Sequence, residues 1–299
     1  MTTALRTAPS RLLVPLAWAN LVANIGIVVT GGAVRLTGSG LGCPTWPRCT
    51  EDSYVPHGEL GINGAIEFGN RTLTFVLVAI AVACWVAALL PVVRDRDEAD
   101  RRPLVLATVI ALGIPAQAVI GGVTVRTDLN PWVVALHLLV SMAIIGTCVL
   151  LLDHLAGRPR SWALPWTRRA ALATFVAGWV VLYLGTVVTG SGPHSGDEDA
   201  RRTGLDPGSM SHVHAWAVWA LVALTITTLV LAGRDGNLPL RSAALVLLAV
   251  ECGQGVVGYT QYFLDLPIAL VLVHLLGAAL TAAALAWVAI STRAHRPTR

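Results

Sequence analysis

The sequence predicts an all-α membrane protein whose eight transmembrane helices form two duplicated four-helix bundles. The first observation is composition, because 55% of the 299 residues are hydrophobic and 13% are charged, whereas soluble domains are roughly 45–50% apolar and roughly 25% charged. The mean hydropathy of +0.68 agrees with this. The second observation is a series of eight apolar runs, and the third is a long segment that occurs twice. We therefore expect a multi-pass protein of the cell membrane, surrounded by the lipid bilayer.

Each apolar run is long enough to cross about 30 Å of hydrocarbon as a helix. In chain order the runs are Leu12–Val34, Ala65–Val93, Leu104–Val125, Trp132–Leu155, Ala170–Gly190, Met210–Ala232, Ser242–Tyr259 and Pro267–Ile290. The longest segment outside them, from about Arg35 to Asn63, is too short to form an independent domain. Function is therefore expected inside the helix bundle or at its rim.

A segment of the chain is repeated at a constant offset of 137 residues. Gln117–Leu139 and Gln254–Leu276 share Gln, Val, Gly, the pair Asp-Leu and a closing His-Leu-Leu, so that His137 corresponds to His274. A second similarity relates residues 26–31 to residues 185–190. Such self-similarity indicates a duplicated unit. We place the division in the charged loop after the fourth run, which gives an N-terminal half of residues 1–163 and a C-terminal half of residues 164–299.

Arginine supplies all 21 basic residues and indicates the orientation in the membrane. Fifteen of the arginines lie in the two termini and in the loops after the second, fourth and sixth runs. The positive-inside rule then places both termini in the cytoplasm. The net charge of +4 follows from this topology, and we expect no nucleic-acid partner.

The repeated histidines lie at matching depths in the membrane. At about 1.5 Å per residue, both lie one to two turns below the outer surface. The even-numbered helix before each one supplies further polar residues near its outer start: Glu67, Asn70 and Arg71 in the first half, and the Ser-His-Val-His segment of residues 211–214 in the second. Histidines on neighbouring helices at one level are suited to bind a haem iron from both sides. In the second half, His214 is favoured over His212 because it corresponds to Asn70.

The first outer loop carries a long motif that resembles one family. The residues GGAVRLTGSGLGCPTWP at positions 31–47, followed by Cys49 and by the Glu-x-x-x-Arg of residues 67–71, resemble haem A synthase. The resemblance spans the chain, with eight helices, duplicated halves, paired outer cysteines and histidines on the even-numbered helices. It implies a haem-dependent oxidoreductase that oxidises the C8 methyl group of haem O to a formyl group through hydroxylated intermediates.

The same resemblance implies the site residues. The C-terminal half is expected to hold a haem b cofactor between His214 and His274, and the N-terminal half to receive haem O beside Glu67 and His137. The chain departs from the family at Asn70, where a histidine is usual. Because asparagine is a weak iron ligand, two arrangements stay open: a five-coordinate iron bound through His137, or an Asn70 that only hydrogen-bonds to a water.

Glu67 is the candidate catalytic residue, because a carboxylate beside the methyl group can accept a proton or stabilise a developing positive charge. The alternative interpretation is a helix salt bridge with Arg71, which is compatible with catalysis. Arg71, Arg35 and Arg126 are candidates to bind a haem propionate.

Cys43 and Cys49 flank a short proline-containing turn in the first outer loop. An oxidising compartment permits a disulfide there, and such a bond would fix the loop over the N-terminal site. The alternative is two free thiols.

The expected partners are haem O, haem O synthase as its donor in the same membrane, and an electron acceptor that the sequence does not identify. Two other classes compete with the enzyme. A di-haem electron carrier of the cytochrome b type would need strong ligands in both halves, and Asn70 argues against it. A transporter would be expected to have broken helices near the midplane, whereas the polar positions of this chain cluster near the outer surface.

Overall fold

The computed structural model describes residues 11–95, 97–157, 163–197 and 200–292, and eight long α-helices make up most of that part of the chain. Their bounds are α1 Leu13–Leu36, α2 Gly61–Arg94, α3 Arg102–Arg126, α4 Pro131–Ala156, α5 Pro165–Ser191, α6 Pro207–Arg234, α7 Leu238–Phe263 and α8 Ile268–Ser291, with a short 3₁₀ helix, η1, at Gly58–Leu60 before α2. All eight α-helices are long and apolar enough to span a membrane. The predicted fold class, an all-α protein with eight membrane helices, is confirmed.

The helices extend past several of the apolar runs because helical backbone continues to a proline or a capping side chain. The helix α5 begins at Pro165 and α6 at Pro207, where the missing N–H costs nothing. The Asn237 side chain accepts a hydrogen bond from the Leu240 N–H at 3.1 Å and caps α7. The Asp206 side chain accepts one from the Ser209 N–H at 2.7 Å and caps α6, and this bond lowers the pKa of Asp206. Prolines and capping side chains therefore determine where each helix begins, while hydrophobicity determines its central part.

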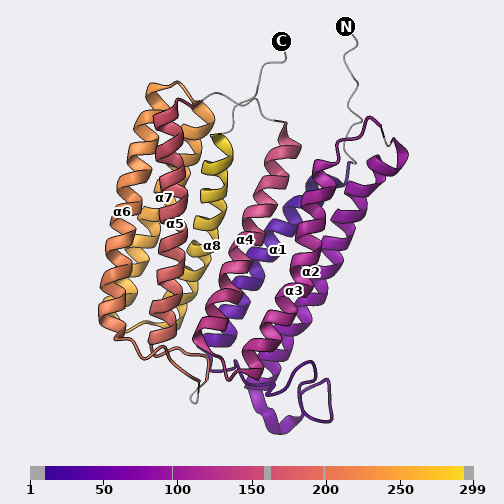
Figure 1. Ribbon diagram of the computed structural model, residues 1–299. Helices are drawn as coiled ribbons and strands as arrows, with labels where there is room; N and C mark the ends of the chain where they lie inside the picture. The colour runs from indigo at the N-terminus through magenta and orange to yellow at the C-terminus, as the bar shows by residue number, and fades with distance from the viewer. Residues whose placement is uncertain (1–10, 96, 158–162, 198–199, 293–299) are drawn as a thin grey trace.

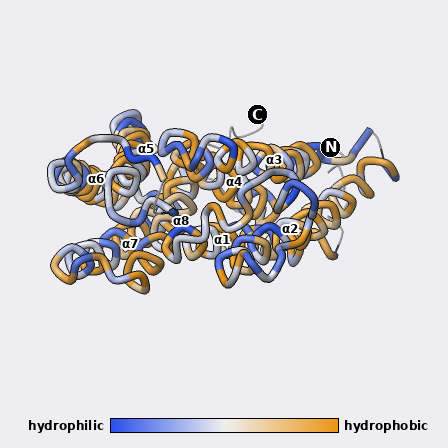
Figure 2. Tube along the Cα trace, turned by 90° about the horizontal axis from the view of Figure 1, so that it is seen from below, coloured by the Kyte–Doolittle hydropathy of each residue, from blue (hydrophilic) through white to orange (hydrophobic). Residues whose placement is uncertain are grey.

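The helices form two rings of four that stand side by side (Figures 1 and 2). In the first ring α1 contacts α2, α2 contacts α3, α3 contacts α4 and α4 contacts α1. The helices α5 to α8 contact one another in the same cyclic order. Because contacts run around each ring, α2 faces α4 across one ring, and α6 faces α8 across the other. Side chains from diagonal helices can therefore meet in the middle of each ring.

The two rings meet along α8, α4, α1 and α5. The helix α8 contacts both α4 and α1, and α4 contacts α5. A Cβ at Gly32 of α1 would clash with the Leu275 side chain of α8, and Gly146 of α4 lies against Ala286 of α8. Small residues at these points let the helices approach closely, as is usual inside membranes, where helix association depends on packing.

The two ends of the molecule differ in their loops. The loop with Cys43 and Cys49 lies at the lower end in Figure 1, and we call this end the disulfide end. The segments between α3 and α4, α5 and α6, and α7 and α8 reach the same end. The helix α1 begins and α8 ends at the opposite end, as an even number of spans requires. Seven of the fifteen arginines used to predict orientation, and residues 158–162 of the predicted division between the halves, lie outside the described residues.

Candidate functional site

A cavity of ≈ 2060 Å³ opens inside the bundle and is lined by residues from both rings. Pockets for a single drug-sized molecule are roughly 300–1,000 Å³, so this cavity has room for more than one large ligand. Its lining includes the predicted iron ligands and the predicted catalytic pair: Glu67, Asn70, Arg71, His137, His214 and His274.

The cavity is lined by equivalent positions of paired helices. On α2 the lining residues are 67, 68, 70, 71, 72, 74, 75, 77 and 78, and adding 144 to each number gives residues of α6 that also line the cavity. The lining residues of α8 and α7 correspond in the same way to α4 and α3 at the offset of 137, with few exceptions. The helix faces that surround the cavity therefore recur, and Asn70 occupies the position that His214 occupies in the other ring.

The helices α1 and α5 follow a different register from the one the sequence similarity suggested. Their lining residues correspond best at an offset of 154, which pairs Gly31 with Gly185 and gives every lining residue of α5 a lining counterpart on α1, rather than at the offset of 159 that aligns Gly26 with Gly185. Gly185 touches the His214 ring, whereas no atom lies within 4 Å of a Cβ placed at Gly26. The second sequence similarity therefore does not mark equivalent surroundings.

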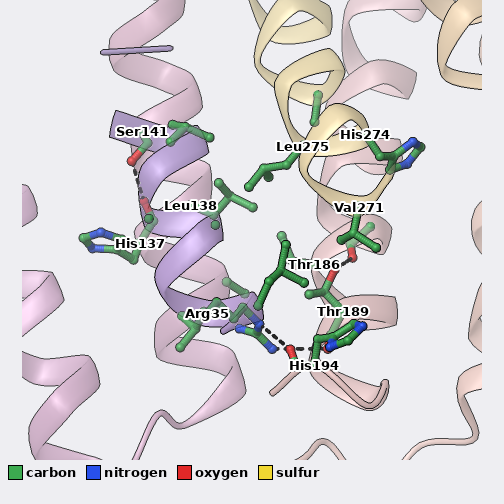
Figure 3. Close-up of a pocket in the computed structure, with 18 of the residues that line it drawn as sticks. Arg35, His137, Leu138, Ser141, Thr186, Thr189, His194, Val271, His274 and Leu275 are labelled. Atoms are coloured by element: carbon green, nitrogen blue, oxygen red, sulfur yellow. Dashed lines mark hydrogen bonds between the residues drawn. The ribbon is translucent and has the colours of Figure 1, made fainter. Parts of the chain in front are cut away.

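The repeated histidines have the same local structure. The Gln117 side chain of α3 donates to the His137 carbonyl at 2.9 Å, and the Gln254 side chain of α7 donates to the His274 carbonyl at 2.9 Å. Each imidazole also lies against a helix glycine, His137 against Gly121 and His274 against Gly258, with its Cε1 atom 3.2 Å and 3.4 Å from the respective Cβ position. Figure 3 shows the imidazoles of His137 and His274 turned away from each other, each toward its own four-helix ring. The repeated glutamine and glycine thus hold the repeated histidine.

The structure distinguishes His214 from His212. The His214 ring lies against Gly185 of α5, and its Nδ1 atom is buried. His212 is exposed, and its ring centroid is 6.4 Å from that of Tyr262. His214 is therefore the histidine of α6 whose side chain is protected beside the cavity. The helix α6 faces α8, which carries His274.

The histidines suit a ligand that brings its own metal. In the described part of the chain, no group of three or more His, Cys, Asp or Glu side chains could hold a bare metal ion. The Nδ1 atoms of His137, His214 and His274 are nevertheless buried without a hydrogen-bond partner, an arrangement that is costly unless a ligand or water compensates it. One or two imidazoles are sufficient for a haem, because the porphyrin supplies the other four bonds to iron. The donor set therefore fits a haem.

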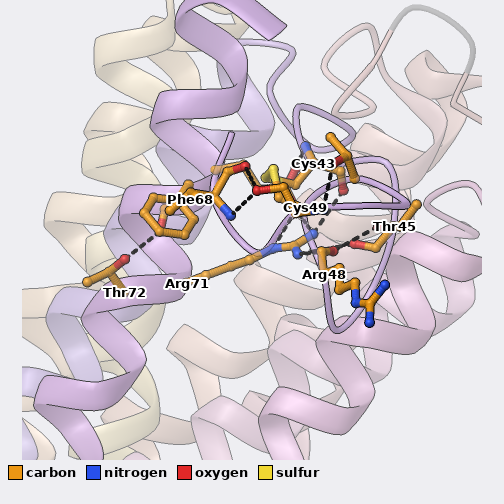
Figure 4. Close-up of a disulfide and its surroundings, with 11 residues drawn as sticks. Cys43, Thr45, Arg48, Cys49, Phe68, Arg71 and Thr72 are labelled. Atoms are coloured by element: carbon orange, nitrogen blue, oxygen red, sulfur yellow. Dashed lines mark hydrogen bonds and ion pairs between the residues drawn. A yellow bond between two sulfur atoms is a disulfide. The ribbon is translucent and has the colours of Figure 1, made fainter. Parts of the chain in front are cut away.

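Figure 4 shows the disulfide loop with Cys43 and Cys49 beside Arg71 of α2. Glu67 of the same helix is buried beneath this loop and is held by three donors. Its Oε2 accepts a hydrogen bond from the Cys43 N–H at 2.6 Å. Its Oε1 accepts from Arg71 Nε at 3.1 Å and from an Arg71 terminal nitrogen at 2.5 Å. The predicted salt bridge therefore exists, and the carboxylate also fixes the loop above it.

Arg71 holds the rest of the loop. Its guanidinium donates to the backbone carbonyls of Cys43, Thr45 and Arg48 at 2.9, 3.1 and 3.2 Å. All three of its nitrogens are thus bound to protein acceptors, so Arg71 is less suited to bind a propionate than the sequence suggested.

Cys43 and Cys49 form a disulfide, and both are fully buried. Between them the Trp46 side chain packs so closely on α3 that a Cβ at Gly122 would overlap it. Arg126 donates to the Trp46 carbonyl at 2.9 Å. The loop is therefore fixed to both α2 and α3, and Arg126 stabilises the loop from outside the cavity.

Arg35 joins the two rings at the disulfide end. Its Nε donates to the His194 carbonyl at 2.8 Å, and a terminal nitrogen donates to the Thr189 carbonyl at 3.2 Å. The His194 ring in turn lies 3.0 Å from the Leu266 carbonyl. Figure 3 shows Arg35 and His194 between the two sites. Of the three arginines proposed for a propionate, Arg35 is the one that lines the cavity without an ion pair among the described residues.

Two groups of cavity residues were not predicted to act there. Glu251 of α7 is buried, accepts a hydrogen bond from the Thr225 hydroxyl at 2.8 Å, and leaves Oε2 without a partner. Gln117 and Gln254 begin the repeated segments, so the repeat itself marked them, but their bonds to the histidine carbonyls depend on how the helices pair.

The chain was compared with known proteins. It matches the family COX15-CtaA, described as cytochrome oxidase assembly protein, over residues 15–194, which is more than half of the chain. The match covers α1 to α5, including Glu67 and His137.

Individual relatives are similar over shorter stretches. A heme A synthase of Bacillus pumilus is 35% identical over 131 residues, covering 42% of this chain and 39% of the relative. A heme A synthase of Shewanella oneidensis is 28% identical over 155 residues, covering 47% and 44% respectively. One from Geobacillus kaustophilus is 28% identical over 113 residues, covering 37% and 32%. Each alignment spans less than half of the relative's length.

Proposed function

The chain belongs to the COX15-CtaA family of cytochrome oxidase assembly proteins, and from this premise we propose that it is a haem A synthase. In this proposal the enzyme oxidises the C8 methyl group of haem O to a formyl group through hydroxylated intermediates. The relatives that are called heme A synthases support this activity, as does the motif of residues 31–49.

The main structural support is the arrangement of polar groups in one large apolar cavity. One ring contributes the His214 and His274 side chains from helices that face each other, and the other contributes His137, Asn70 and a buried Glu67. A strong pair of ligands suits a permanent cofactor, and a weaker set suits a substrate that must leave. We therefore assign the C-terminal half, residues 164–299, to the cofactor and the N-terminal half, residues 1–163, to the substrate.

His214 and His274 would hold the cofactor, which we propose to be haem b. Bound there, haem b would supply reversible one-electron chemistry that carries electrons from the substrate site toward an acceptor. Gly185 and Gly258 hold the two imidazoles in place, and Gln254 fixes the backbone of His274.

Glu67 is the residue that we assign to the chemistry of the methyl group. Three donors hold its carboxylate at a fixed place on the cavity wall, where it can stabilise positive charge that develops on the substrate or accept a proton from it. Arg71 and the disulfide loop act as positioning elements, because they bind the same carboxylate. His137, on the facing helix α4, would bind the substrate iron.

The surroundings of the enzyme follow from the same proposal. The recurring cavity-lining positions support the duplication of a four-helix unit. The distribution of arginine supports an orientation with both termini in the cytoplasm and the disulfide end outside. We propose that haem O synthase delivers the substrate within the membrane, and that an electron acceptor of unknown identity reoxidises the cofactor.

The test is to express the chain in cells that make haem O and to analyse the extracted haems by chromatography and mass spectrometry. The native chain should produce haem A, and Glu67→Gln should stop the reaction or accumulate a hydroxylated intermediate. Glu59→Gln is the matched control, because Glu59 is exposed on η1. Haem O that persists unchanged with the native chain would reject the proposal, and a chain that binds two haems without product would favour the electron carrier.

The cofactor assignment has its own test in the purified protein. His274→Ala should remove the low-spin haem absorption of the C-terminal half, whereas His212→Ala, on the exposed face of α6, should leave it. A low-spin spectrum that is unchanged in His274→Ala would reject the ligand assignment.

A further inference from the structure

The substrate half differs from the cofactor half at one ligand position. Asn70 lines the cavity at the place on α2 that His214 occupies on α6, as the constant offset of 144 residues shows. The partner histidines on the facing helices, His137 and His274, are alike in their contacts. The difference in ligand residues is therefore confined to one side of each site.

The Asn70 side chain is held in a definite orientation. The Thr30 hydroxyl of α1 donates a hydrogen bond to Asn70 Oδ1 at 2.8 Å. The amide oxygen is therefore engaged by the protein and turned toward α1. The remaining donor, Nδ2, has no hydrogen-bond partner among the described residues and is not sealed from the cavity. The amide nitrogen is thus the polar atom that Asn70 offers to a ligand.

The neighbouring helix α1 carries a glycine at the place where a glycine of α5 accommodates the imidazole in the other half. The His214 ring lies against Gly185, its Cε1 being 3.4 Å from the Cβ position of that glycine. The corresponding residue of α1 is Gly31, and no atom lies within 4 Å of a Cβ placed there. A small ligand can therefore occupy, beside the shorter Asn70 side chain, the space that an imidazole takes in the other half.

We propose that the N-terminal half binds its haem through His137 alone and leaves the opposite face of the iron open to a small neutral ligand of the dioxygen class. In this arrangement Asn70 is a ligand-contact residue, and its Nδ2 donates a hydrogen bond to the small ligand. Thr30 is a positioning residue, because its hydroxyl fixes the amide. The inference rests on the proposed function, since it requires haem in both halves.

Carbon monoxide is the probe, because it binds reduced haem iron only where a coordination position is open. The purified native protein, loaded with haem and reduced, should bind carbon monoxide at the N-terminal haem and keep the C-terminal haem six-coordinate. Asn70→His should lower carbon monoxide binding by about tenfold or more, since a second imidazole competes for the iron. The mirror variant His214→Asn should create a second carbon monoxide site.

The hydrogen bond has a separate readout in the C–O stretching frequency. Asn70→Leu should retain carbon monoxide binding but shift the stretch, because the donor is lost. Thr30→Val should change the stretch in the same direction by a smaller amount. Thr147→Val is the control, because Thr147 of α4 does not line the cavity and its hydroxyl bonds to its own helix at the Ala143 carbonyl, so this variant should leave the stretch unchanged.

The outcomes separate this inference from the proposed function. A protein that carries two haems but binds no carbon monoxide when reduced, or an Asn70→Leu variant with an unchanged C–O stretch and affinity, would overturn the inference and leave the synthase proposal standing. A protein that binds no haem at all would remove both. Asn70→Leu serves if Asn70→His fails to fold, because leucine adds no ring to the site.

Discussion

Replacing Arg71 by methionine tests whether the Glu67–Arg71 pair holds the disulfide loop over the cavity. Methionine keeps an apolar stem but removes five hydrogen bonds, two to Glu67 and three to loop carbonyls. It also leaves the Glu67 carboxylate without its opposite charge. We expect the loop to open more often and the Cys43–Cys49 disulfide to become more accessible.

The expected size follows from burial. The side chains of Arg71 and Glu67 are 22% and 7% exposed, and removing one partner of a buried ion pair costs about 3–5 kcal/mol. Because Arg71 is partly exposed, we expect the lower end, about 3 kcal/mol, which corresponds to roughly 100-fold in the open population. Both cysteines are fully buried, so their reduction requires this local opening.

The assay is the rate at which a thiol reductant opens the disulfide in detergent, followed by trapping of the free cysteines with a maleimide. Arg48→Met is the control, since Arg48 lies in the same loop and its guanidinium bonds to the Glu51 carbonyl rather than to Glu67. The double variant with Glu67→Gln should be less labile than Arg71→Met alone, because no unpaired carboxylate remains. A reduction rate in Arg71→Met within threefold of native, or a double variant as labile as the single, would refute the reasoning.

Three further predictions concern the loop, the cofactor half and the topology. Gly122→Val should push Trp46 off α3 at a cost of about 1–3 kcal/mol, and proteolysis within residues 37–60 should become faster. The control Gly69→Ala has no atom within 4 Å of its Cβ position and should stabilise α2 by up to about 1 kcal/mol. Equal rates of proteolysis in the two variants would contradict this prediction. Gln254→Leu should lower the free energy of unfolding by only about 0.6 kcal/mol, measured in a denaturing-detergent titration, but should weaken the retention of haem at His274. Haem retention equal to that of the native protein would show that the bond to the His274 carbonyl has no role in binding. In intact cells an impermeant maleimide should label Asp52→Cys but not Asp97→Cys, both exposed positions, and the reverse pattern would reject the predicted orientation.

The sequence predicted the helices well because each depends on local properties. An apolar run of sufficient length must form a helix in hydrocarbon to satisfy its backbone. Each of the eight runs therefore coincides with a helix, and the ends differ by at most five residues. The repeat at an offset of 137 residues also predicted that His137 and His274 share surroundings, and the glutamine and glycine contacts of the two histidines agree with this.

Contacts between distant segments were harder to predict. The i,i+4 spacing indicated the Glu67–Arg71 pair, but nothing in the spacing showed that both side chains also bind the backbone of the disulfide loop. Arg35 was considered for a propionate, and the structure adds that it bonds to carbonyls of the other half. These contacts join residues 24 to 159 positions apart, and the packing of the helices decides them.

What the sequence alone determined is the set of elements and the chemistry that they carry: eight spans, a repeated histidine, a buried acid and a cysteine pair in one loop. Composition and spacing are sufficient for these, because the bilayer imposes the helix and the helix imposes the depth of each residue. What only the tertiary structure decided is which side chains face the common cavity and which serve the scaffold. Asn70 shows the physical reason, since its role depends on a hydroxyl from α1 and on the open space at Gly31 of the same helix, and neither is fixed until the helices pack.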